Sequence, residues 1–118
     1  MSTKAISLPL HGALEMFAAP AIMAAPFLLG FGPAATVITV GLGAVLLGLA
    51  LQVEGSGRGI PLSAHAGFDY VLALVATFAG LAVGLIADER NAGIFLVGIG
   101  VAMVLLTAST RFTRPRGA

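Results

Sequence analysis

Four long apolar stretches, separated by short polar or glycine-rich turns, dominate this sequence. They run over about residues 10–31, 34–52, 65–87 and 92–110. A helix needs about 20 mostly apolar residues to cross the roughly 30 Å hydrocarbon layer of a membrane, because each residue advances it by about 1.5 Å. The stretches lack the alternation of apolar and polar residues that marks strands. We therefore predict an all-α integral membrane protein, a bundle of four transmembrane helices.

The composition excludes several other classes of protein. The chain of 118 residues is 58% hydrophobic and 9% charged, whereas soluble domains carry about 25% charged residues. So short a chain buries only about two-thirds of its surface on folding, and a soluble version would leave many apolar side chains in water. A net charge of +1 argues against nucleic acid as a partner, and the absence of cysteine excludes a disulfide scaffold.

The basic residues predict the orientation in the membrane. Four crossings put both chain ends and the central loop on one side. That side carries Lys4, Arg58, Arg111, Arg114 and Arg116. The other side carries only Arg90, beside two acids. Because basic residues gather on the cytoplasmic side, we predict a multi-pass protein of the cell membrane with both termini in the cytoplasm. A signal peptide is the competing interpretation of the N-terminus, but Glu15 interrupts its apolar region.

The two halves of the chain resemble each other. A shift of 54 residues aligns His11 with His65, Glu15 with Asp69 and Ala19 with Ala73. A shift of 57 residues aligns residues 40–43 (Val-Gly-Leu-Gly) with residues 97–100 (Val-Gly-Ile-Gly). We predict two tandem helical-hairpin repeats, about 8–53 and 61–112, within a single membrane domain that spans residues 1–118. Both copies start and end on the same side, so their symmetry axis runs along the membrane normal.

The end of the first apolar stretch carries a recognisable pattern. Residues 25–31 read Ala-Pro-Phe-Leu-Leu-Gly-Phe, and residues 37–42 of the next stretch read Val-Ile-Thr-Val-Gly-Leu. This pattern resembles the SPW-repeat family of small integral membrane proteins, which is named for a Ser-Pro-Trp motif near the end of the first of two helices. Ala-Pro-Phe stands at that place here, and the second repeat has Ala-Gly-Leu at residues 79–81. The resemblance implies a multi-pass membrane protein made of hairpins and implies no chemistry.

Four ionisable side chains lie inside the predicted helices. They are His11, Glu15, His65 and Asp69. Residues four apart share a helix face, so each histidine lies one turn from an acid. Ionisable groups within membranes usually face the bundle interior and find a partner, and the repeat symmetry favours two pairs that face each other. We expect both acids at a depth of about 5–8 Å from the cytoplasmic end.

These four residues leave three functional interpretations open. The leading one is a non-enzymatic structural or partner-binding module in which a His/carboxylate cluster holds the helices together. The second is a metal- or haem-binding redox protein with the same four residues as candidate ligands, because imidazole and carboxylate suit zinc, copper and iron alike. The third is a proton-coupled small-molecule transporter of the small multidrug-resistance kind, using Glu15. The residues identify no particular cofactor.

Packing and partners can also be predicted. Ala76, Gly80 and Gly84 continue the face of Asp69 at a spacing of four, and such small residues allow close helix packing. We expect Ala44 and Gly48 of the second helix to oppose them.

The polar turn at residues 88–91 is expected to cap the helices beside it. The lipid bilayer is the expected partner, with a homo-oligomer or another membrane protein as a further one.

Overall fold

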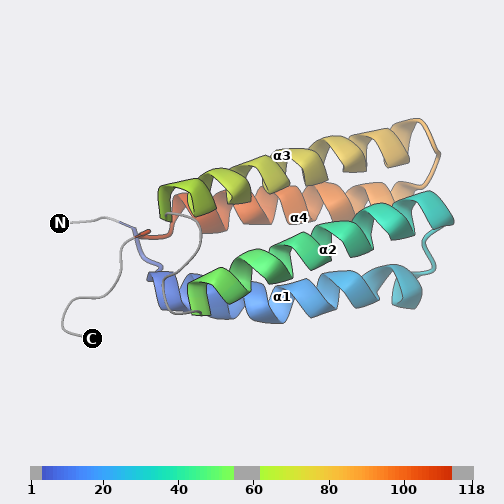
Figure 1. Ribbon diagram of the computed structural model, residues 1–118. Helices are drawn as coiled ribbons and strands as arrows, with labels where there is room; N and C mark the ends of the chain where they lie inside the picture. The colour runs from blue at the N-terminus through green and yellow to red at the C-terminus, as the bar shows by residue number, and fades with distance from the viewer. Residues whose placement is uncertain (1–3, 55–61, 113–118) are drawn as a thin grey trace, which may run out of the picture.

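A computed structural model describes residues 4–54 and 62–112 of the chain, which form an antiparallel bundle of four helices (Figure 1). The helices are α1 (Leu8–Leu29), α2 (Pro33–Glu54), α3 (Leu62–Leu85) and α4 (Arg90–Ala108). Each of them is long enough and apolar enough to cross a membrane. The all-α, four-helix fold predicted from the apolar stretches is therefore confirmed, and it indicates a multi-pass membrane protein.

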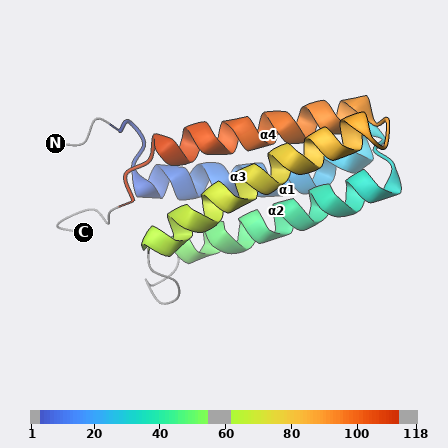
Figure 2. The same cartoon turned by 90° about the horizontal axis from the view of Figure 1, so that it is seen from above.

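The bundle consists of two hairpins. Helix α1 packs along α2, and α3 packs along α4, whereas the contacts between the hairpins are much fewer. The start of α1 and the end of α4 lie side by side at one end of the bundle, which we call the terminal end (Figure 2). The α1–α2 and α3–α4 turns lie at the opposite end. Of the basic residues used to predict the orientation, Arg58, Arg114 and Arg116 lie outside the described residues. The predicted first residue of the second repeat, residue 61, also lies outside them.

Helices α1 and α3 begin two to three residues earlier than predicted. The Oγ atom of Ser7 accepts a hydrogen bond from the backbone N–H of Leu10 at 3.3 Å and so caps the start of α1. Glu15 is consequently the eighth residue of α1, and Asp69 is the eighth residue of α3. By the helical rise both acids lie about 10 Å from the helix start rather than at the expected 5–8 Å.

Glycines set the distance between α3 and α4. A Cβ atom on Gly80 would lie 2.8 Å from the carbonyl oxygen of Gly93, and a Cβ on Gly100 would lie 2.7 Å from that of Ala73. The prediction that Gly80 and Gly84 oppose α2 is therefore wrong, since a Cβ on Gly84 would likewise meet Gly93 of α4. Ala76 does pack against α2, in one cluster with Ala35 and Leu42. A spacing of four carries no information about which neighbouring helix each residue meets. A Cβ on Gly48 of α2 would meet no atom within 4 Å.

At the end opposite the termini, a side chain ties the two turns together. The Oε1 atom of Glu89 accepts a hydrogen bond from the backbone N–H of Gly32 at 2.7 Å. Glu89 occupies the N-cap position of α4, but its side chain makes no capping bond there. The expected capping role is therefore wrong for this residue, because its carboxylate reaches the other hairpin instead.

Candidate metal centre

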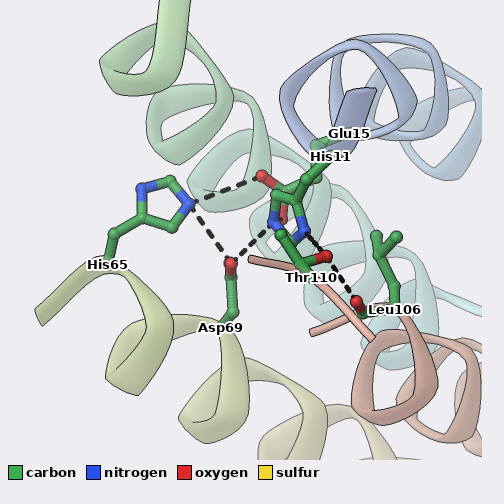
Figure 3. A network of polar contacts seen from close by, with 6 residues as sticks. All are labelled: His11, Glu15, His65, Asp69, Leu106 and Thr110. Carbon is green, nitrogen blue, oxygen red and sulfur yellow. Dashed lines mark hydrogen bonds and ion pairs between the residues drawn. The ribbon is translucent and has the colours of Figure 1, made fainter. Parts of the chain in front are cut away.

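The four candidate residues meet inside the bundle near its terminal end. His11 and Glu15 extend from α1, and His65 and Asp69 extend from α3 (Figure 3). All four are buried, with between 0% and 2% of their surface exposed. Each histidine is the fourth residue of its helix and each acid the eighth, so one turn of helix separates the two side chains in each pair.

Each imidazole contacts both carboxylates. The Nε2 atom of His11 lies 2.9 Å from Oδ2 of Asp69 and 3.1 Å from Oε2 of Glu15. The Nε2 atom of His65 lies 3.2 Å from Oδ2 of Asp69 and 3.6 Å from Oε1 of Glu15 (Figure 3). Every histidine therefore meets the acid of its own helix and the acid of the other hairpin. The two pairs therefore face each other, as expected from the sequence.

The four donor atoms form a compact set with unused bonding capacity. One ligand atom from each residue can be chosen so that all four lie within 4.8 Å of one another. Within the described residues, three buried atoms of the four side chains make no hydrogen bond: Glu15 Oε1, His65 Nε2 and Asp69 Oδ1. The first two lie in the longer contacts given above, at 3.2 and 3.6 Å. Because buried polar atoms normally have a hydrogen-bond partner, a proton or a metal ion would complete the bonding of this cluster.

Two residues that the sequence did not single out complete the surroundings. Thr110 Oγ1 donates a hydrogen bond to the carbonyl of Leu106 at 2.6 Å and lies 2.8 Å from Nδ1 of His11 (Figure 3). The ring of Phe112 packs edge-on against His11, with centroids 5.0 Å apart, and lies 5.9 Å from the ring of His65. Thr110 is the last residue of the last apolar stretch and Phe112 follows that stretch, and no spacing in the sequence connects either residue to the histidines.

Comparisons with known proteins identify no relative: no protein-family model, curated protein or solved structure matches this chain. The resemblance to the SPW-repeat family therefore stays a prediction.

Proposed function

We propose that this chain is a non-enzymatic membrane protein that binds one divalent transition-metal ion between its two hairpins. Zn²⁺ is the ion used in the tests below. The observation that carries the proposal is the convergence of two imidazole nitrogens and two carboxylate oxygens within 4.8 Å. The expected ligands are His11, Glu15, His65 and Asp69.

The spacing of the donor atoms supports a tetrahedral site. Zinc bonds to imidazole nitrogen and carboxylate oxygen measure about 2.0–2.2 Å, which places the ligand atoms of a tetrahedron about 3.3–3.6 Å apart. The nitrogen-to-oxygen distances, which involve both oxygens of Glu15, range from 2.9 to 3.6 Å. The four candidate ligand atoms lie within 4.8 Å of one another, so the most distant of them have to approach by about 1 Å to form a regular tetrahedron.

The ligand types narrow the choice of metal. The chain has no cysteine, so the thiolates that select Cu(I) or an iron–sulfur cluster are missing, whereas Mg²⁺ and Ca²⁺ favour sites made of oxygen alone. Two imidazoles with two carboxylates suit Zn²⁺, Fe²⁺ or Cu²⁺. Four protein ligands fill a tetrahedral site and leave no position for a substrate, which favours binding over catalysis.

Charge balance favours the same assignment. A net charge is costly in the low dielectric of a membrane interior. A divalent ion offsets the two carboxylates, Glu15 and Asp69, and leaves the imidazoles neutral. Two protonated imidazoles would offset them equally well, and in that case the cluster would be a structural clamp between the hairpins. A metal titration distinguishes these two states.

The positions of the carboxylates argue against haem, which the sequence analysis considered as a cofactor. Their oxygens lie 2.9–3.6 Å from Nε2 of both histidines, in the space that a macrocycle between two axial imidazoles would fill. We therefore do not propose haem as the cofactor.

One observation favours the transporter as a second candidate. An apolar cavity of about 270 Å³ lies between α1, α2 and α4, and among the residues that the structure describes Glu15 is the one ionisable residue that borders it. A lipophilic cation would find apolar walls and a carboxylate there. Efflux of such a cation that is lost in Glu15→Gln would support this candidate, and inert behaviour with several cations would end it.

The distribution of the basic residues supports a location in the cell membrane with both termini in the cytoplasm.

One pair of contacts supports the predicted duplication. A Cβ on Gly43 would lie 3.0 Å from the carbonyl oxygen of Ala19, and a Cβ on Gly100 would lie 2.7 Å from that of Ala73. The shift of 57 residues aligns Gly43 with Gly100, and the shift of 54 residues aligns Ala19 with Ala73. The two contacts are therefore at equivalent positions of the two hairpins.

The test is a zinc titration of the full chain in detergent after treatment with a chelator, read with a chromophoric competitor. We expect one Zn²⁺ per chain and, since loss of an outer partner alone weakens metal sites about 10–100-fold, a still larger loss in His65→Gln. Asp88→Asn removes a carboxylate at the opposite end and should bind like the parent. No binding by the parent, or equal binding by His65→Gln, would reject the metal and leave the structural clamp.

A further inference from the structure

The two ends of the described chain form a clasp over the metal centre, made of residues 4–7 and 109–112. The backbone N–H of Ile6 donates to the carbonyl of Ser109 at 3.0 Å, and the N–H of Arg111 donates to the carbonyl of Ile6 at 2.8 Å. These bonds form a parallel bridge between Ile6 and Thr110 (Figures 1 and 2). The bridge holds Thr110, which is fully buried, beside the ring of His11.

The hydrogen bonds of Thr110 determine which nitrogen of His11 carries a proton. A hydroxyl group has one hydrogen to donate, and that hydrogen goes to the carbonyl of Leu106 at 2.6 Å. The 2.8 Å contact between Oγ1 and Nδ1 of His11 must therefore be a bond that the Nδ1–H group donates and Oγ1 accepts. The proton of the neutral ring is consequently on Nδ1.

This assignment points the free lone pair of the ring into the cluster. With the proton on Nδ1, the lone pair is on Nε2, which lies 2.9 Å from Oδ2 of Asp69 and 3.1 Å from Oε2 of Glu15. A lone pair that faces two carboxylate oxygens is repelled unless a cation or a proton lies between them. In established metal sites, a histidine ligand likewise donates its other ring N–H to an outer partner, which fixes its tautomer and orientation.

We propose that Thr110 is a positioning residue of the metal centre, which holds His11 in the tautomer and orientation that make Nε2 the ligand atom. The inference rests on the proposed metal binding and adds to it a contribution from the clasp, which holds Thr110 in place. The site is then complete only when residues 4–7 and 109–112 are paired. Phe112, packed against both imidazole rings, covers the same side of the site.

The first experiment compares two substitutions at one position in the full chain. Thr110→Val keeps the branched shape and removes the hydroxyl, and we expect it to weaken Zn²⁺ binding by about 10–100-fold, the usual effect of losing an outer partner. Thr110→Ser keeps the hydroxyl and should bind Zn²⁺ within about threefold of the parent. Thr36→Val is the matched control, since Thr36 donates to the carbonyl of Phe31 at the opposite end and its loss should leave the affinity unchanged.

The second experiment needs no substitution at Thr110. In ¹⁵N-histidine spectra of the zinc-loaded parent, assigned with His11→Gln, we expect His11 to show a protonated Nδ1 and a metal-bound Nε2. Zinc on Nδ1, or equal affinity of the parent and Thr110→Val, would overturn the role of Thr110 while leaving metal binding intact. A parent chain that binds no Zn²⁺ would overturn both proposals, so the two failures are distinguishable.

Discussion

The Nε2 atom of His11 on α1 lies 2.9 Å from Oδ2 of Asp69 on α3, although 58 residues separate the two in the chain. This contact joins the two hairpins, which otherwise touch much less than the helices within each hairpin do. Both side chains are fully buried, so breaking the contact leaves a polar group without its partner in an apolar interior. The proposed metal binding would therefore be linked to the association of the hairpins.

Zinc should stabilise the folded chain only when the carboxylates are present. A ligand at 100 times its dissociation constant adds about 2.7 kcal/mol to the free energy of unfolding. We expect zinc to raise the unfolding temperature of the parent in detergent and to have no effect on the double variant Glu15→Gln/Asp69→Asn. An equal rise in both proteins would show that zinc stabilises the chain from another site.

Two glycines of α4 should differ in their response to substitution by alanine. Gly100→Ala would place a Cβ against Oγ1 of Thr77 and 2.7 Å from the carbonyl oxygen of Ala73, and overpacking of this kind costs about 1–3 kcal/mol. Gly98→Ala is the control, because its Cβ would meet no atom within 4 Å, and it should be neutral or stabilising. Thermal unfolding in detergent measures both, and equal losses would contradict the close packing of α3 on α4.

The turn-to-turn bond should contribute to stability without affecting the metal. Glu89→Ala removes the acceptor that holds the N–H of Gly32 at 2.7 Å, and we expect a loss of about 1–2 kcal/mol in the free energy of unfolding. Asp88→Asn is the control in the same turn, since asparagine tolerates the positive φ of 57° found there. Zinc affinity should be unchanged in both variants, and a loss of zinc affinity in Glu89→Ala would contradict the separation of the two ends.

Cysteine labelling tests the orientation, because the chain has no cysteine of its own. With an impermeant thiol reagent added outside intact cells, we expect Asp88→Cys to react and Arg111→Cys to react only after the cells are opened. The reason is the gathering of basic residues on the cytoplasmic side of membrane proteins. The reverse pattern would show that the protein has the opposite orientation in the membrane. Labelling of both variants from outside would contradict the crossing of the membrane by α4, which separates the two positions.

The sequence predicted most of the fold and the members of the site. Hydropathy located four helices to within a few residues, because a membrane span requires a run of apolar residues whatever its neighbours are. The spacing of four between each histidine and its acid, repeated in the second half, identified all four residues of the cluster. These features are local in the chain, or are repeated within it, and so can be recognised without coordinates.

The contacts that depend on three-dimensional arrangement could not be predicted in this way. The bond from Gly32 to Glu89 depends on how two turns meet, and the one from His11 to Thr110 depends on the pairing of the chain ends. The partner of Gly80 depends on the rotation of α3 about its axis, which a spacing of four leaves open. In each case the sequence specifies a suitable residue and the packing of distant segments decides its partner.

X-ray absorption at the zinc edge, measured on the purified chain with one equivalent of Zn²⁺, observes the ligands of the proposed ion itself. We expect four nitrogen or oxygen neighbours at about 2.0–2.1 Å, with the outer-shell scattering of two imidazole rings. A shell without imidazole scattering, or a spectrum that the double variant Glu15→Gln/Asp69→Asn leaves unchanged, would contradict the proposed metal centre.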